Sequence, residues 1–124
     1  MTSMMAPSAL EWPDGNRAAL GSGGSNRLRT AILQVLLNII DFRLPVEEAV
    51  HAPRVHYENG LLSVEGGFDM ERLGPLLEAF PDHHVWDARN MFFGGVHTVI
   101  AGHGGGMHGA GDPRRGGVSL VCEV

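Results

Sequence analysis

The chain of 124 residues is 44% hydrophobic and 19% charged, a composition typical of one folded domain (residues 1–124) and unlike that of a disordered tail. Its net charge of −5, carried with nine arginines and no lysine, argues against a nucleic-acid partner and excludes a Schiff-base lysine or a phosphate-loop lysine. No apolar run reaches the roughly 18 residues that a membrane span needs, so no membrane span is predicted.

The N-terminal third is predicted to form a β-hairpin followed by a long helix. Residues 8–12 and 17–21 flank the segment 13–16 (Pro-Asp-Gly-Asn), which is a strong turn signal. We expect the helix to be capped by Asn26 and to run to about Phe42. Its apolar side chains cover most of its circumference, which is typical of a helix buried on nearly all sides.

A glycine-rich turn, residues 21–27 (Gly-Ser-Gly-Gly-Ser-Asn-Arg), joins this hairpin to this helix. Such a turn aims several backbone N–H groups at one point, with the positive end of the helix dipole behind them. It suits anion binding or the stabilisation of an oxyanion during acyl transfer, and its spacing does not fit a dinucleotide fingerprint. An ordinary strand-to-helix connection explains the spacing equally well. Because no nucleophile stands beside the turn, we interpret it as one half of an enzyme site.

The remainder of the chain is predicted to alternate short helices and strands. A hairpin is expected around the Asn-Gly turn at 59–60, and a helix at 69–80 that Gly74-Pro75 kinks or splits. The other predicted elements are a helix at 46–51, strands at 54–57, 61–65, 85–88, 95–101 and 118–124, and a long loop or loose hairpin connection at 102–117. The order β-β-α-α-β-β-α-β-β-β predicts an α+β fold in which helices cover one face of a mostly antiparallel sheet.

Other polar residues are predicted to have structural roles. None of the seven histidines has the spacing of a metal site, so neither a metal nor another cofactor is predicted. Arg54 and His56, on one face of a predicted strand, are expected to be buried structural groups. Asp112 and Arg114 are expected to lock the loop that contains them.

Four segments, taken together, resemble the C-terminal part of the γ-glutamyltransferase (γ-glutamyltranspeptidase) family. Residues 3–8 (Ser-Met-Met-Ala-Pro-Ser) resemble its Ser-Ser-Met-x-Pro-Thr segment, and residues 21–27 resemble its Gly-Ser-Pro-Gly-Gly-Ser-Arg turn. Residues 48–56 fit its Glu-Ala-x-x-x-Pro-Arg-x-His pattern, and residues 109–114 resemble its Gly-Ala-Ser-Asp-Pro-Arg. Four such segments in the same order, at compatible separations, make the resemblance specific over essentially the whole chain.

This resemblance implies an N-terminal-nucleophile hydrolase fold, a four-layer αββα sandwich made from a self-cleaving precursor. In that family the new N-terminal Thr of the small subunit attacks a γ-glutamyl amide, using its own α-amino group as the base. Water or an amine then resolves the γ-glutamyl enzyme. The chain would be the C-terminal part of the small subunit. Its partners would be the N-terminal large subunit, the start of the small subunit and a γ-glutamyl substrate.

The resemblance also implies roles for single residues. Ser3 matches the first Ser of a pair that contacts the glutamyl α-carboxylate, and Met4 replaces the second. A gapless alignment places the two oxyanion glycines on Gly24 and Ser25, with Gly23 at the Pro position; a shift of one residue places them on Gly23 and Gly24. Because backbone N–H groups do the work, Ser25 is acceptable if its φ is not positive. Thr2 lies downstream of where the family's nucleophile begins, so the chain alone is expected to be inactive.

Two alternatives remain open. Met4 favours a different acylase or amide hydrolase on the same fold, because the pocket then lacks a hydroxyl for the glutamyl carboxylate. The other alternative is a non-catalytic module that pairs with another chain. A piece of a four-layer fold should expose apolar surface and unpaired strand edges, so we predict a homo-oligomer. The compartment is left open, because the family is often periplasmic or extracellular and its signal would lie upstream.

Overall fold

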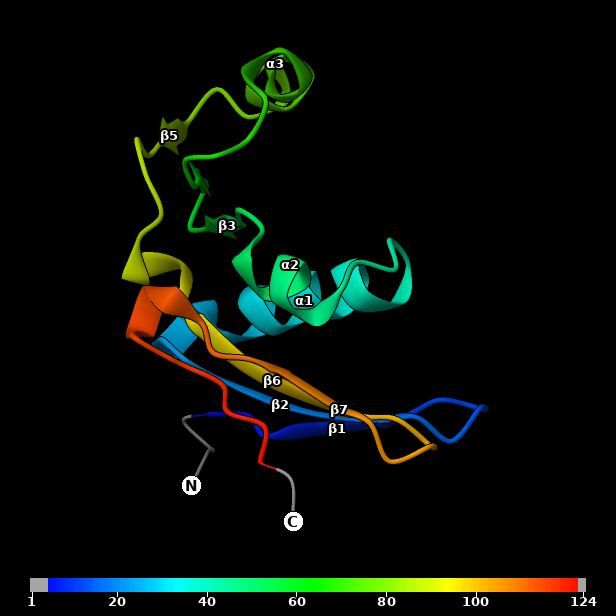
Figure 1. The fold of residues 1–124 in the computed structure, drawn as a ribbon. Coiled ribbons are helices and arrows are strands. Elements are labelled where there is room, and N and C mark those ends of the chain that lie inside the picture. Colours follow the sequence, from blue (N-terminus) through cyan, green and yellow to red (C-terminus); the bar gives the residue numbers. More distant parts are fainter. Residues whose placement is uncertain (1–4, 123–124) are drawn as a thin grey trace.

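Figure 1 shows a computed structural model of the protein, which describes residues 5–122. Its element order is the predicted β-β-α-α-β-β-α-β-β-β. Short 3-10 turns lie at Ser25–Arg27 (η1), Met91–Phe93 (η2) and Pro113–Arg115 (η3). The helices and strands are β1 (Ser8–Glu11), β2 (Arg17–Gly23), α1 (Leu28–Ile40), α2 (Val46–His51), β3 (Val55–Glu58), β4 (Leu61–Val64), α3 (Met70–Ala79), β5 (His83–Val85), β6 (Gly95–Ala101) and β7 (Met107–Ala110).

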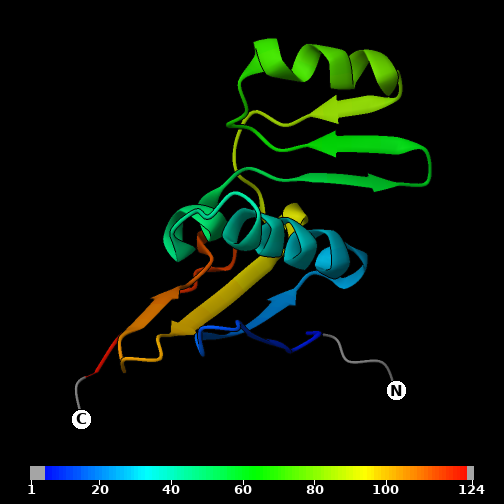
Figure 2. The same ribbon diagram turned by 90° about the vertical axis from the view of Figure 1, so that its right-hand side faces the viewer.

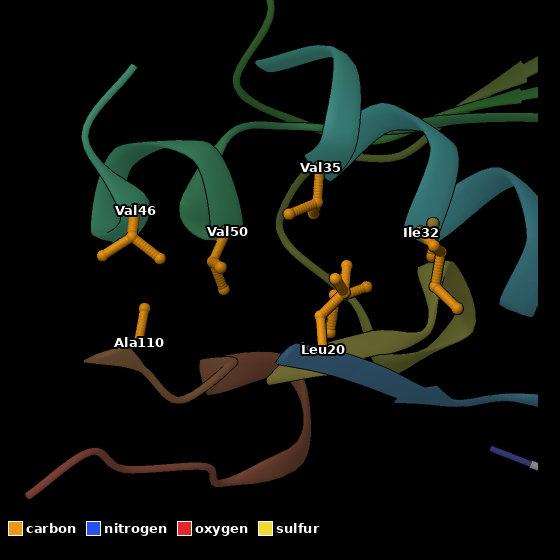
Figure 3. Close-up of a cluster of buried hydrophobic side chains, with 8 residues drawn as sticks. Leu20, Ile32, Val35, Val46, Val50 and Ala110 are labelled. Carbon is orange, nitrogen blue, oxygen red and sulfur yellow. The ribbon is translucent and has the colours of Figure 1, made fainter. Parts of the chain in front are cut away.

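A four-stranded antiparallel sheet in the order β1-β2-β6-β7 forms one layer of the molecule, and α1 and α2 cover one of its faces (Figures 1 and 2). The pairing of β2 with β6 runs from Arg17 opposite Ala101 to Gly23 opposite Gly95. Alternate residues of β2 point toward the helices, as the period of a strand requires. The core between sheet and helices, drawn in Figure 3, consists of Leu20, Ala31, Ile32, Val35, Val46, Val50, Val96 and Ala110.

A second sheet, in the order β3-β4-β5, lies on the side of α1 and α2 away from the first sheet (Figure 2). Its strands β4 and β5 are parallel, and α3 packs on it through a small core of Leu62, Val64 and Leu73. The predicted α+β fold, with helices on one face of a mostly antiparallel sheet, is therefore confirmed for the first sheet. The division of the strands into two sheets was not predicted, because short strands do not specify their partners.

Apart from helix α1, three predicted elements differ from the structure. The strand predicted at 85–88 is found at His83–Val85 instead. Residues 118–122 form no regular element, and the last strand within residues 5–122 is β7, inside the segment predicted as a long loop or loose hairpin connection. The helix at Met70–Ala79 is not split and contains Pro75. Pro75 has no N–H group to donate to the carbonyl of Glu71, four residues earlier, and Glu71 is exposed to solvent.

Helix α1 differs from its prediction at its start and on its outer face. Among residues 5–122, no side chain caps this helix, and the side chain of Asn26 donates to Glu58 instead. The helix is also not buried on nearly all sides, because Leu33, Leu37 and Ile40 are 55%, 38% and 43% exposed.

No helix within residues 5–122 is long and apolar enough to cross a membrane.

Candidate functional site

The glycine-rich turn forms a sharp bend between β2 and α1. Gly23 is the last residue of β2, opposite Gly95, and the chain then turns through Gly24 with φ 135° and Ser25 with φ 56°. The condition set for Ser25 in the sequence analysis is therefore not met. A left-handed φ costs a non-glycine residue about 1–2 kcal/mol. Strained backbone of this kind persists only where its surroundings hold it, and it is enriched at functional sites.

The backbone N–H groups of the bend are available to a ligand. Within residues 5–122, the N–H groups of Gly24 and Ser25 donate to no protein atom. The bend uses its carbonyls instead, because the N–H of Arg27 donates to the Gly24 oxygen at 3.3 Å and the N–H of Leu28 donates to the Ser25 oxygen. Gly24 is half-buried and Ser25 is exposed, so neither N–H group is sealed inside the core.

The bend is packed between Gly94 and Arg115. A Cβ atom on Gly24 would lie 3.0 Å from the Gly94 Cα and 3.4 Å from Nη2 of Arg115. A Cβ atom on Gly95 would lie 2.5 Å from Cγ of Arg115. A side chain at 24 or 95 would therefore displace Arg115 or the backbone of Gly94, and the guanidinium of Arg115 brings positive charge to the bend. Arg115 was not predicted as a site residue. The one sequence feature connected with it is that its side chain lies against the paired glycines 23–24 and 94–95, which are distant in sequence.

A buried ionic network holds the segment that carries Arg115. Nη2 of Arg54 lies 2.7 Å from Oδ2 of Asp112, and Nε of Arg114 lies 2.8 Å from Oε1 of Glu65. Nη1 of Arg114 also lies 3.2 Å from Oδ1 of Asp112, and all four side chains are buried. Burial alone would raise the pKa of Asp112, but the Arg54 charge and hydrogen bonds from backbone N–H groups outweigh it and lower that pKa.

This network joins distant parts of the chain. Arg54 lies between α2 and β3, Glu65 follows β4, and Asp112 caps the turn η3. Oδ2 of Asp112 also accepts the N–H of Val96 in β6, at 2.8 Å. The two sheets are therefore tied together beside the bend. Glu65 is a structural member of this network, and both of its arginine-bearing partner segments are distant from it in the sequence.

His56 belongs to a different group of polar side chains, so it does not meet Arg54. Its Nδ1 lies 2.7 Å from Oγ1 of Thr30 in α1, and its Nε2 lies 3.4 Å from Oε2 of Glu58. Oε1 of Glu58 accepts the side-chain N–H of Asn26, at 2.9 Å. These contacts reach the first turn of α1 from β3.

The remaining predicted site residues, Ser3 and Met4, lie outside the described residues. The oxygen of Met5 accepts the N–H of Ser22, at 2.9 Å, so the first described residue runs beside the end of β2. A cavity of about 570 Å³ lies away from the bend, between the start of α2 and strands β6 and β7. Within residues 5–122, no three His, Cys, Asp or Glu side chains gather as a metal site.

Comparison with known proteins assigns the chain to a family. The family model described as gamma-glutamyltranspeptidase matches residues 1–122. The chain belongs to the γ-glutamyltranspeptidase family. It is similar to the glutathione hydrolase proenzyme of Escherichia coli (strain K12), with 36% identity over 114 residues that cover 90% of this chain and 19% of the relative. It is also similar to the acylase ACY 1 proenzyme of Pseudomonas sp. (strain SE83), with 45% identity over 65 residues, 52% of this chain and 11% of the relative.

Among solved structures, a highly active mutant of gamma-glutamyltranspeptidase from Pseudomonas nitroreducens matches with a TM-score of 0.78 and 28% identity, over 100% of this chain and 64% of that chain. The fold is thus part of an N-terminal-nucleophile hydrolase sandwich, as the resemblance implied. In this chain, sheet β1-β2-β6-β7 forms one layer, and helices α1 and α2 form a second layer against it. The chain spans about a fifth of the length of the glutathione hydrolases that it matches, 19% and 22%.

Proposed function

We propose that this chain is the C-terminal part of an enzyme that transfers or hydrolyses γ-glutamyl groups through a covalent acyl-enzyme. In this proposal, the N–H groups of Gly24 and Ser25 form the oxyanion hole. The observation that carries it is the pair of unpartnered N–H groups on a strained bend, in a member of this family. The nucleophilic Thr and the large subunit belong to the rest of the protein.

The bend suits this role because its donors are fixed before the reaction. When the nucleophile attacks the amide, negative charge develops on the carbonyl oxygen. Fixed N–H donors stabilise that charge without reorganising, and each donor typically contributes about 3–4 kcal/mol to the transition state. The start of α1 and the guanidinium of Arg115 add positive potential at the same place.

The geometry favours Gly24 and Ser25 over the shifted pair Gly23 and Gly24. Gly23 is still within β2, where it pairs with Gly95 of β6. Gly24 and Ser25 follow the last residue pair of the ladder, and their N–H groups have no partner within residues 5–122. This supports the gapless alignment, in which Gly23 takes the place of the family's Pro. Ser25 keeps the backbone donor of the second glycine despite the positive φ that a glycine would adopt at lower cost.

Two substitutions at one position test the proposal in the complete protein. Gly24→Pro deletes the N–H group, whereas Gly24→Ala keeps it and introduces comparable backbone strain. We expect kcat for a γ-glutamyl anilide to fall about 100- to 1,000-fold further in the Pro variant than in the Ala variant. Equal kcat values for the two variants would move the oxyanion role to other residues.

A different acylase on the same fold is the second candidate. It is supported by the 45% identity to the acylase ACY 1 proenzyme and by Met4 at the position of the family's second Ser. Methionine offers no hydroxyl to a glutamyl carboxylate. The complete protein should be assayed on γ-glutamyl amides and on acyl amides that lack the α-carboxylate. A higher kcat/KM for the second group would favour the acylase.

The isolated chain should not turn over a γ-glutamyl anilide, because donors without a nucleophile do not form the acyl-enzyme. Turnover well above that of buffer would contradict this expectation. It would also show that a nucleophile lies within these 124 residues.

A further inference from the structure

The side chain of Asn26 holds the bend to another sheet. It caps neither η1 nor α1, and its Nδ2 donates to Oε1 of Glu58, 32 residues along the chain, at 2.9 Å. Glu58 is the last residue of β3. Asn26 directly follows Ser25, so this hydrogen bond restrains the strained bend from outside its own segment.

His56 makes the second connection between β3 and α1. Its side chain is buried, and its two ring nitrogens face Thr30 and Glu58. Thr30 lies in the first turn of α1, and its hydroxyl is also 3.2 Å from the oxygen of Arg27. Asn26, Glu58, His56 and Thr30 therefore form one continuous chain of hydrogen bonds, which we call the β3 clamp.

The β3 clamp holds residues 26–30, which follow the bend, whereas Arg115 lies against Gly23 and Gly24 at its start. Arg115 and Gly94 restrict Gly24 from the side of η3 and β6, whereas the clamp holds the residues that follow Ser25. Two left-handed residues in succession, without a side-chain cap, do not hold their geometry unaided. The clamp supplies restraint where the local sequence supplies none.

We propose that Glu58 and His56 are positioning residues, which hold the first turn of α1 and thereby aim the N–H groups of Gly24 and Ser25. This inference rests on the proposed function for its catalytic consequence. Its structural part, the coupling of the clamp to the bend, can be tested without measuring any activity. Neither side chain acts on the substrate; each acts through Asn26 or Thr30.

The charges around the clamp favour an ionised Glu58. Hydrogen bonds from His56 and then from Asn26 lower the pKa of Glu58, and the charge of Arg27 acts in the same direction. The other neighbours of His56 are Ser63 from β4, Thr30 from α1 and the ring of Phe92 from η2, and none of them carries a charge. Glu58 and Arg27 are therefore the charged groups beside the clamp.

The coupling is tested first in this chain by nitrogen–proton NMR, without any substrate. Glu58→Ala removes the acceptor of the Asn26 side chain and one partner of His56, so the amide signals of Ser25 and Asn26 should shift relative to the wild-type chain. The amide of Gly105, in the loop after β6, serves as the control and should keep its position. Bend amides that keep their wild-type positions in Glu58→Ala would overturn the inference.

The catalytic consequence is tested in the complete protein. Because a displacement of about 1 Å at a site can cost about a hundredfold in rate, Glu58→Ala and His56→Phe should each lower kcat about 10- to 100-fold with little change in KM. Glu58→Gln should restore most of kcat, because its amide oxygen can accept from His56 and its NH2 group can donate to Oδ1 of Asn26 once the Asn26 side-chain amide turns over. Glu78→Ala, on exposed α3, is the matched control for removing a glutamate.

The two proposals fail differently in these experiments. Unchanged kcat in Glu58→Ala, or equal losses in the Ala and Gln variants, would overturn the positioning role while Gly24→Pro still reports on the oxyanion role. If Gly24→Pro behaves like Gly24→Ala, the proposed function fails. The NMR result then still decides whether the clamp holds the bend.

Discussion

At the residue scale, Ser25 has a backbone conformation that is unfavourable for a residue other than glycine. Its φ of 56° lies in the left-handed region, and its N–H group has no partner within residues 5–122. A serine in this conformation is less stable than a glycine, whereas the proposed oxyanion role needs only the backbone N–H group.

Ser25→Gly should therefore increase the free energy of unfolding by about 1 kcal/mol and leave the N–H donor in place. Ser25→Ala is the matched control, because it removes the hydroxyl and keeps the strain, so we expect no gain from it. Urea denaturation of the two variants measures the difference. A Gly variant no more stable than the Ala variant would mean that the backbone at 25 is not strained.

At the scale of elements, the buried network of Arg54, Glu65, Asp112 and Arg114 connects the two sheets and sets the place of η3. Removing one partner leaves a buried charge without compensation. Asp112→Ala should thus lower the free energy of unfolding by about 3–5 kcal/mol, as measured by denaturation. Glu11→Ala removes an exposed ion pair with Arg17 and should change it by less than about 1 kcal/mol.

The pH dependence of stability follows from the same carboxylate. The pKa of Asp112 is lower in the folded protein than its usual 3.8, so its contribution is complete above that value. As the pH falls below it, the unfolded chain takes up the proton first, and the contribution is lost progressively down to the folded pKa. The loss of stability between pH 5 and pH 2 should be smaller in Asp112→Asn, and an identical loss would contradict this account.

Elements with strong local signals were predictable from the sequence. The hairpin of β1 and β2, the helix Val46–His51 and the strand Gly95–Ala101 follow turn residues, prolines and apolar periodicity. By contrast, β7 has little strand character of its own and exists because it pairs with β6, whereas residues 118–121 have apolar strand character and find no ladder. Long-range pairing decided both cases.

In the candidate site too, features marked by the local sequence were predictable, and contacts between distant segments were not. The bend was found from its glycines, because local chemistry marks it. Two contacts were not found: Arg115 against the bend, and Glu58 with Asn26, since each joins the bend to a distant segment. Asn26 was expected to cap a helix, a local role, and a contact 32 residues away took its side chain instead.

At the scale of the whole molecule, the chain exposes apolar side chains and the edges of a sheet. Leu33, Leu37 and Ile40 form an exposed apolar stripe on α1, and β1 and β7 are the edges of the four-stranded sheet. We expect the isolated chain to form dimers or larger species.

Sedimentation velocity over a range of concentrations measures this association. Leu33→Gln combined with Leu37→Gln should shift the chain toward monomer, whereas Leu120→Gln, in the irregular C-terminal segment, should not. A wild-type chain that stays monomeric at all concentrations would contradict self-association. It would favour an independent, non-catalytic module.

The most direct measurement is a crystal structure of the complete protein with its γ-glutamyl acyl-enzyme trapped. The account predicts that the acyl carbonyl oxygen lies about 2.7–3.1 Å from the backbone nitrogens of Gly24 and Ser25. A carbonyl oxygen held by other donors, with the bend turned away from it, would contradict the central claim.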